Sequence, residues 1–240
     1  MIVSIHQPEH LPWLGFFDKV QQADLFVLLD TTQFAKDDFQ NRNRIRAGVA
    51  PAWITVPVYT RGLSQQRIAD VAICNDQNWP GRCLGLLRAH YRKAPYFAAH
   101  APFFERVYAS SWTKLVELNV RLIGYLADQL GLTTRVVLAS DLDVWEQGGT
   151  AVNLTICRRV GATTYLSGER GRDYLDEAAF TEHGIEVRYQ DFRHPVYPQV
   201  GQGFFPRLSA VDLLFNHGPD SAAILRGADW PMATARPAPA

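Results

Sequence analysis

Two histidines stand four residues apart in the segment His6-Gln7-Pro8-Glu9-His10, directly after a short apolar run. A histidine at the end of a strand can hold a phosphate or carboxylate, or exchange a proton near neutral pH. Pro8 breaks the helix that would place both imidazoles on one face, and no spacing indicates a further ligand, so no metal site is expected. The alternative is that His6 only closes a tight turn.

A second polar segment, residues 30–46, follows another apolar run. Its densest part is Gln40-Asn41-Arg42-Asn43, whose planar amide and guanidinium groups suit a sugar, nucleotide or carboxylate ligand. In an extended strand Arg42, Arg44 and Arg46 would share one face and form a positive stripe. A solvated loop that caps helices is the alternative, but four adjacent groups of this type favour binding.

The third constellation is Ser167-Gly168-Glu169-Arg170-Gly171-Arg172-Asp173, between a predicted strand and a predicted helix. Free backbone N–H groups at a helix start, together with arginine, can form an anion pocket. The segment matches neither the Gly-x-Gly-x-x-Gly fingerprint nor a Walker loop, which needs a Gly-Lys-Ser/Thr ending. A plain turn between strand and helix is the competing interpretation.

The fourth constellation is His194-Pro195-Val196-Tyr197-Pro198-Gln199, with Asp212 and Asn216 following on one predicted helix face. Two prolines and an aromatic ring stiffen this loop, which suits a lid or a substrate wall. It equally suits a structural strap, because buried backbone groups need polar partners. Nucleophilic catalysis is poorly supported: no Gly-x-Ser-x-Gly motif is present, and Cys157 lies in an apolar helical stretch where a buried, inert thiol is the default.

Secondary-structure elements must position these four polar segments, and the sequence around them alternates between strand and helix patterns. Buried strands are predicted at 2–5, 25–29, 135–139, 163–167 and 185–189, a weaker strand at 68–73, and at 53–58 an edge strand that contains Pro57. Helices are predicted from Trp13 and from Ser209, over 79–91, 103–130 and 174–183, and after Gly148-Gly149, where the helix includes 154–160.

This alternation predicts an α/β fold, a three-layer, Rossmann-like, mostly parallel sheet with a helical insertion. Residues 1–230 are expected to form a single domain, and residues 231–240 a disordered tail. Ligands of such sheets bind at the carboxyl ends of the strands, where His6 and Asp30 would both lie.

The composition limits the partners. The 240 residues carry 24 basic and 24 acidic side chains, so the formal net charge is zero, whereas a binder of nucleic-acid polymers shows a basic excess. Three cysteines without a Cys-x-x-Cys motif, a start without a basic signal-peptide region and no apolar stretch near 20 residues predict a cytoplasmic protein without membrane insertion. Basic residues clustered at 42–46 and 170–172 suit one small anionic ligand. The oligomeric state is left open.

Several blocks of the chain form a recognisable set. The early blocks are Ile5-His6-Gln7-Pro8, Leu11-Pro12-Trp13-Leu14-Gly15-Phe16-Phe17-Asp18-Lys19, Gln33-Phe34 and Phe39-Gln40-Asn41-Arg42-Asn43. The later blocks are Tyr165-Leu166-Ser167-Gly168, His194-Pro195-Val196-Tyr197-Pro198-Gln199 and Leu208-Ser209 with Asp212-Leu213-Leu214-Phe215-Asn216. Together they resemble the WbqC-like family from about residue 2 to residue 226. The family pattern has a tyrosine or another aromatic residue at the position of His10. This departure favours His6 over His10 as the catalytic histidine.

Members of that family occur in bacterial surface-polysaccharide gene clusters. The resemblance therefore implies a transferase or ligase that joins a glycyl, other aminoacyl or acyl group to an amino sugar, such as a nucleotide-linked one, in O-antigen biosynthesis. In this interpretation His6 stabilises or protonates a developing oxyanion, and Asp30 is the base toward the attacking amine. The substrate-binding residues would be Gln7, Trp13, Lys19, Gln33, Gln40, Asn41, Arg42, Asn43, Ser167, Gly168, His194, Tyr197 and Gln199.

A second, local resemblance concerns how the acid would be activated for amide formation. Residues 29–34 and 38–39 are similar to pantoate–β-alanine ligases, which adenylate an acid with ATP before an amine attacks it. The His-x-Gly-His nucleotide motif of that superfamily is absent, so the cofactor is left open, with ATP and Mg²⁺ as the candidate. Two other hypotheses stand beside amide formation: a nucleotidyl transferase-like enzyme, and a non-enzymatic module that binds a nucleotide sugar.

Overall fold

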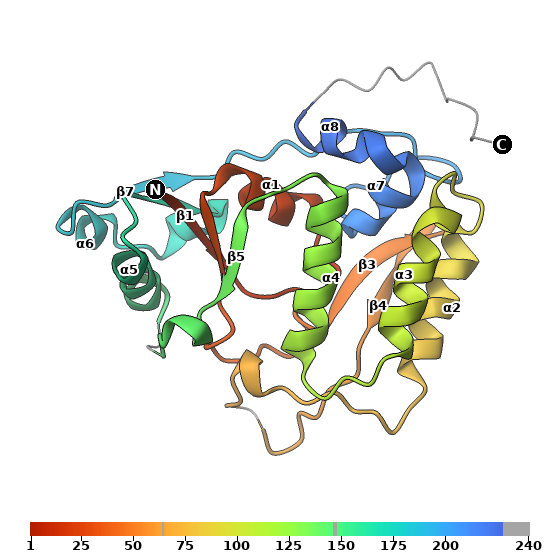
Figure 1. Ribbon diagram of the computed structural model, residues 1–240, viewed down its shortest axis with the longest axis horizontal. Coiled ribbons are helices and arrows are strands. Elements are labelled where there is room, and N and C mark those ends of the chain that lie inside the picture. Colours follow the sequence, from red (N-terminus) through yellow and green to blue (C-terminus); the bar gives the residue numbers. More distant parts are fainter. Residues whose placement is uncertain (64, 146–147, 228–240) are drawn as a thin grey trace.

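A five-stranded parallel sheet lies at the centre of the protein (Figure 1). The computed structural model describes residues 1–63, 65–145 and 148–227. The strands follow the order β5-β2-β1-β6-β7, and every neighbouring pair is parallel. β1 is therefore central, and the strand order changes direction between β1 and β6. The bounds are β1 Ile2–His6, β2 Leu25–Leu28, β5 Arg135–Leu138, β6 Thr164–Ser167 and β7 Glu186–Tyr189.

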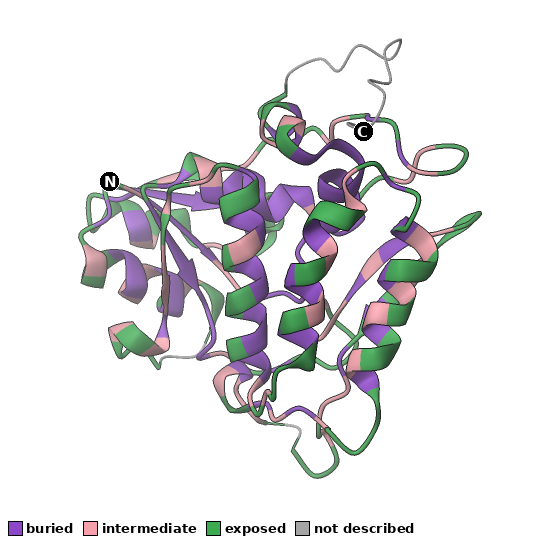
Figure 2. Cartoon of the chain, turned by 45° about the vertical axis from the view of Figure 1, so that its right-hand side comes forward, coloured by how far each residue is buried: buried purple, intermediate pink, exposed green. Residues whose placement is uncertain are grey.

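Helices cover both faces of this sheet, because successive side chains of a strand point to opposite sides. Leu25 and Val27 of β2 belong to an apolar cluster with α5 (Gly149–Val160) and α6 (Glu177–Thr181). Phe26 and Leu28 belong to the other cluster, with α1 (Leu14–Gln22), α4 (Leu115–Gln129) and α7 (Ala210–His217). The long helices accordingly show a buried side and an exposed side in Figure 2. The predicted three-layer, Rossmann-like α/β fold is confirmed.

The first unit, β1-α1-β2, forms because its apolar residues follow the pattern of buried strands in β1 and β2 and the helical period in α1. Leu14, Phe16, Phe17 and Val20 fall on the face of α1 that is buried against the sheet. After the helix ends, the carboxylate of Asp24 accepts a hydrogen bond of 2.7 Å from the backbone amide of Ile2. This rigid unit fixes the end of β1 relative to α1.

The segment between β2 and β5 is the predicted insertion. It contains the antiparallel hairpin β3 (Arg42–Ala47) and β4 (Ala50–Thr55), the short 3-10 turn η1 (Ile68–Asp70), and helices α2 (Trp79–Tyr91), α3 (Phe97–Ala109) and α4. Figure 1 shows these helices and the hairpin beside the parallel sheet. α4 packs back against the sheet, so the insertion shares the larger apolar cluster.

Four predicted elements differ from the structure. The strand predicted at 53–58 is β4, which ends at Thr55, before Pro57. Of the strand predicted at 68–73, residues 68–70 form η1, and Ala72 and Ile73 form isolated bridges. The apolar side chains of this segment can be buried by a turn as well as by a strand. The helix predicted over 103–130 is two helices: the hydroxyl of Ser110 bonds the carbonyl of Arg106 at 2.9 Å and closes α3. The helix predicted over 174–183 shortens to α6, after the 3-10 turn η3 (Glu169–Asp173).

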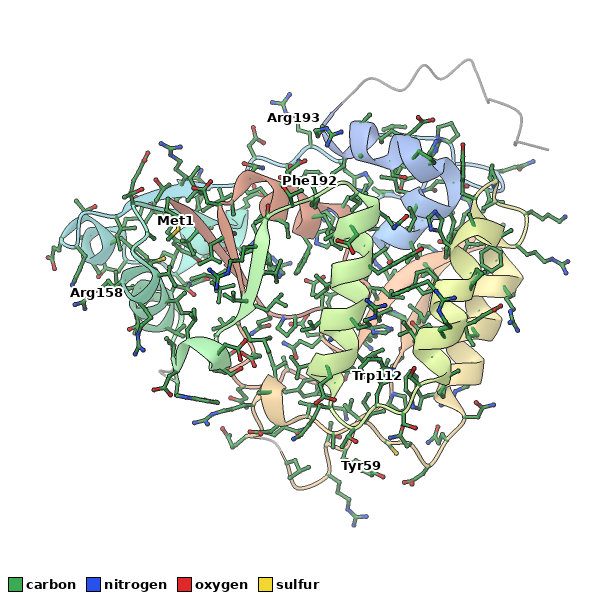
Figure 3. The ribbon with its side chains drawn as sticks, in the orientation of Figure 1. Met1, Tyr59, Trp112, Arg158, Phe192 and Arg193 are labelled. Atoms are coloured by element: carbon green, nitrogen blue, oxygen red, sulfur yellow. The ribbon has the colours of Figure 1, made fainter. Side chains whose placement is uncertain are left out.

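After β7 the chain crosses the molecule as a strap, defined here as residues 191–208, which leads to α7, η4 (Gly218–Asp220) and α8 (Ser221–Leu225). Phe192 in the strap packs edge-on against Trp13 with ring centroids 5.5 Å apart, above α1 in Figure 3. The tail predicted at 231–240 lies outside the described residues. Within the described ranges, no helix has the length and apolarity that a bilayer crossing requires.

Candidate functional site

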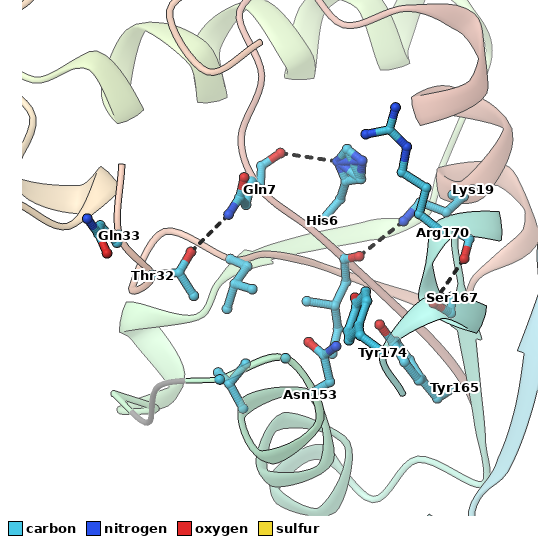
Figure 4. A pocket seen from close by; sticks show the side chains of 17 residues that line it. His6, Gln7, Lys19, Thr32, Gln33, Asn153, Tyr165, Ser167, Arg170 and Tyr174 are labelled. Atoms are coloured by element: carbon cyan, nitrogen blue, oxygen red, sulfur yellow. Dashed lines mark hydrogen bonds between the residues drawn. The ribbon is translucent and has the colours of Figure 1, made fainter. Parts of the chain in front are cut away.

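A cavity of about 510 Å³ opens at the carboxyl ends of β1 and β6, where the strand order changes direction. Open α/β sheets bind their ligands at this place, because the loops from the two strands leave in opposite directions and part there. Figure 4 shows the cavity between the ends of the strands, α5 and η3. It is lined by Ile5, His6, Gln7, Lys19, Leu29, Thr32, Gln33, Gly148, Gly149, Val152, Asn153, Tyr165, Ser167, Gly168, Arg170, Gly171 and Tyr174.

Two cations face one side of the cavity, Lys19 from α1 and Arg170 from η3, as Figure 4 shows. Lys19 is only 3% exposed, and its Nζ donates a hydrogen bond of 3.1 Å to the carbonyl of Ile5. Burial lowers the pKa of Lys19 to about 8, and the nearby carboxyl group of Glu9 opposes that shift. An anion in the cavity would favour the charged form of Lys19 and gain a desolvated partner.

Glycines let the backbone close around the same corner. A Cβ on Gly171 would lie 2.1 Å from Oγ of Ser167, and a Cβ on Gly149 would lie 2.5 Å from the ring of Tyr174. These positions tolerate no side chain without movement, so α5, η3 and the end of β6 approach closely. The first N–H groups of α5 have no partner within their helix and carry its positive dipole end, which favours an anion.

His6 stands at the edge of this corner. Its Nδ1 lies 3.3 Å from the carbonyl oxygen of Gln7, and its ring meets Phe16 edge-on at 5.1 Å. Burial, and then the charge of Lys19, lower the pKa of His6 well below its usual value. The imidazole is therefore neutral at pH 7 and able to accept a proton.

Amide groups form the other side of the cavity. Gln7 donates to the hydroxyl of Thr32 at 3.2 Å, and Asn153 reaches the cavity from α5. Gln40 does not line the cavity but orients Gln7, since its amide donates to Oε1 of Gln7 at 2.7 Å. Gln33 completes this wall from the loop after β2. Such groups can select hydroxyl and carbonyl positions of a sugar or nucleotide.

Asp30, predicted as a base, lies outside the cavity lining. Its carboxylate is 1% exposed and accepts two hydrogen bonds from Ser140, 3.0 Å from the amide and 2.6 Å from the hydroxyl. These bonds tie the loop after β2 to η2 (Ser140–Leu142), which follows β5. A buried carboxylate in this position serves the connection between the two strands, and it is not among the residues that line the cavity.

The predicted cluster at 41–43 also lies apart from the cavity. Asn41 donates to the carbonyl of Val56 at 2.8 Å and so closes the hairpin. Arg42 forms an ion pair of 3.1 Å with Asp37 and stacks 4.3 Å from the ring of Trp53. The side-chain oxygen of Asn43 accepts a hydrogen bond from the following amide.

The remaining predicted residues lie in the strap or, in the case of Trp13, against it. Trp13 stacks on His194 with centroids 6.4 Å apart, and the hydroxyl of Tyr197 donates to Asp212 at 3.1 Å. Oε1 of Gln199 accepts a hydrogen bond of 2.9 Å from the buried guanidinium of Arg46. The structure thus brings His6, Gln7, Lys19, Gln33, Ser167 and Gly168 together and places the other predicted residues elsewhere.

The extent of the sequence similarity agrees with this geometry. The model of the WbqC-like protein family matches residues 7–224, which include the strap and all of the cavity lining except Ile5 and His6. The chain belongs to the WbqC-like protein family. It is 35% identical to the uncharacterized protein Rv1507c of Mycobacterium tuberculosis (strain ATCC 25618 / H37Rv) over 226 residues, 93% of this chain and 97% of that protein. No solved structure is significantly similar to this WbqC-like chain.

Several cavity residues of this WbqC-like protein escaped the sequence-based prediction. Arg170 was predicted as part of an anion pocket but not named as a substrate-binding residue, and the pair Gly148-Gly149 carried the signal of glycines before a predicted helix. Asn153 and Tyr174 carried none, because α5 and η3 bring them to β1 only through tertiary packing. Across the described ranges, no group of three or more histidine, cysteine, aspartate or glutamate residues is placed to hold a metal ion.

Proposed function

We propose that this WbqC-like protein forms an amide bond between a glycyl, other aminoacyl or acyl group and the amine of a nucleotide-linked amino sugar, for bacterial surface polysaccharide. The observation that carries the proposal is the cavity where β1 and β6 part, which combines an anion corner with a neutral imidazole. The cavity volume of about 510 Å³ is in the range of small-molecule sites.

The anion corner fits the diphosphate of a nucleotide sugar. Lys19 and Arg170 supply positive charge from two different elements, and the N-terminus of α5 adds backbone donors. The whole chain is neutral, so this local charge selects a small anion and not a polymer. The amide wall of Gln7, Gln33 and Asn153 would then orient sugar hydroxyls next to His6.

The chemistry follows from the ionisation of His6. When an amine attacks an activated acyl carbon, the new C–N bond forms, the leaving group departs with its electron pair, and the nitrogen must lose a proton. A neutral imidazole at the cavity edge accepts that proton. Where the acyl donor is a free acid, ATP with Mg²⁺ would activate it as an acyl adenylate with release of pyrophosphate, and AMP would leave when the amine attacks.

The test is incubation of the purified protein with glycine, ATP and Mg²⁺ and a panel of nucleotide-linked amino sugars, read by mass spectrometry. We expect a mass gain of one acyl group on one of the sugars. Arg170→Gln should raise KM for that sugar about tenfold, whereas Arg158→Gln, an exposed arginine on α5, should not.

Two other results would overturn the proposal. Release of pyrophosphate from ATP and a sugar phosphate without any amine would identify a nucleotidyl transferase-like enzyme. Calorimetric binding of a nucleotide sugar with no mass gain across the panel, and with several acyl donors, would identify a binding module.

A further inference from the structure

Glu9 is a buried carboxyl group beside His6 and Lys19 that does not line the cavity. It is 7% exposed and lies in the turn that follows β1. Its Oε1 is 3.8 Å from Nε2 of His6, and its Oε2 is buried without a hydrogen-bond partner among the described residues. A buried carboxyl oxygen without a partner is costly, so its retention points to a use beyond stability.

The groups around Glu9 act on its charge in opposite directions. The pKa of Glu9 is raised to about 8, by burial most of all and then by the carboxylate of Asp38. Lys19, on α1, lowers it. Glu9 is thus close to its titration point near neutral pH, beside an imidazole that is itself neutral.

The arrangement of the imidazole defines which nitrogen Glu9 serves. Nδ1 of His6 lies 3.3 Å from the carbonyl oxygen of Gln7, which can only accept a hydrogen bond. The neutral ring therefore carries its hydrogen on Nδ1 and its lone pair on Nε2, the atom that faces Glu9.

We propose that Glu9 is the positioning residue of His6: its ionised carboxylate, 3.8 Å from Nε2, stabilises the imidazolium that forms when His6 takes a proton. The inference rests on the proposed function for the source of that proton, the amine of the sugar. During acyl transfer the amine proton moves to the lone pair of Nε2, and where Glu9 has already lost its own proton to solvent, the charge of its carboxylate stabilises the imidazolium across 3.8 Å. The proton then passes to solvent, and the pair returns to its resting state.

The first experiment follows the imidazole nitrogens of His6 by NMR across pH 5–10, with His6→Asn to assign the signals. Because Glu9 ionises next to Nε2, the His6 shifts should show an inflection near pH 8. Glu9→Gln should abolish this inflection and Glu9→Asp should move it. Glu182→Gln, which changes the exposed glutamate that follows the last residue of α6, should leave it in place. An unchanged His6 titration in Glu9→Gln overturns the inference.

The second experiment measures turnover against pH with the nucleotide-linked amino sugar and acyl donor found active in the wild type. Glu9→Gln should lower kcat at pH 8 by about 10- to 100-fold with KM for the sugar nearly unchanged, and Glu9→Asp should recover part of it. A kcat profile equal to that of the wild type overturns the inference. If the wild type turns over no substrate while Glu9→Gln still removes the inflection, the proposed function fails and the coupling between Glu9 and His6 stands.

Discussion

At the scale of single residues, three ionisable side chains share one small volume at the end of β1. Burial lowers the pKa of His6 and of Lys19, and it raises the pKa of Glu9. Each shift favours the uncharged form, which is what a dry cavity requires in the absence of a ligand. Binding of an anion reverses this preference at Lys19, so ligand affinity and ionisation are linked.

We expect the binding of uridine diphosphate to weaken as the pH rises through about 8. Lys19 loses its proton in that range, because its pKa is lowered from 10.5 to about 8. Calorimetry at pH 7 and pH 9.5 should show a loss of about tenfold, equivalent to about 1.4 kcal/mol. Lys19→Met should bind weakly at both values; a variant that kept the full pH dependence would assign it to another group.

Glu9→Gln should raise thermal stability in alkaline solution. The pKa of Glu9 in the folded protein is about 8, above its ordinary value of 4.5, so folding becomes less favourable as the pH rises from 4.5 to 8. The substitution removes that cost, and we expect a gain of about 2 kcal/mol at pH 9 after allowing for an unsatisfied amide. The melting temperature at pH 4.5 should change little, and equal shifts at both pH values would contradict the argument.

At the scale of elements, buried strands were predictable because their signal is local. Residues 25–28 are apolar without interruption, and the structure buries all four in β2. Residues 68–73 carry a similar apolar content, yet they form a 3-10 turn, since the contacts that decide between turn and strand come from Thr113 and Lys114, far along the chain.

The same distinction explains the candidate site. His6 and Ser167 lie at the carboxyl ends of predicted strands, where open α/β sheets bind their ligands. The structure places both residues in the lining of one cavity. Arg42 and His194 have the same hydrogen-bonding chemistry, but they serve a hairpin and a strap. Residue type does not reveal whether a polar group meets a ligand or the protein's own backbone.

Gly171→Ala should test the close approach of η3 and β6. The new Cβ would lie 2.1 Å from Oγ of Ser167 and 2.9 Å from Leu175, so one of them must move. We expect a loss of about 1–3 kcal/mol in stability and weaker binding of uridine diphosphate. Gly85→Ala is the control: nothing lies within 4 Å of its Cβ in α2, and it should stabilise by about 0.5–1 kcal/mol.

At the scale of the whole molecule, a buried polar network joins the insertion to the C-terminal helices. Arg46 on β3 donates to Gln199 and to the carbonyl of Gly203 in the strap. Its backbone amide donates to the hydroxyl of Tyr91, which in turn donates to Asp212 on α7 at 2.9 Å. Parts of the chain more than 150 residues apart are thus held by one guanidinium.

Arg46→Met should lower the free energy of unfolding by about 3–5 kcal/mol. The substitution leaves buried carbonyl groups of the strap without a hydrogen-bond donor, and it removes a positive charge that favours the Asp212 carboxylate. Chemical denaturation should show this loss, and limited proteolysis should cut first within residues 191–208. Arg92→Met, at the exposed end of α2, should change stability by less than about 0.5 kcal/mol. Equal losses in the two variants would contradict the role of the network.

The position of β1 in the sheet has a kinetic consequence. β1 is made first but pairs on one side with β6, so Ser4 meets Leu166 only after most of the chain exists. Contacts of such sequence separation slow folding, because the closure of a long loop precedes any gain from pairing. During synthesis, β1, which ends at His6, therefore has one unpaired edge until β6, which ends at Ser167, has been made. In that interval a chaperone can protect the chain from aggregation.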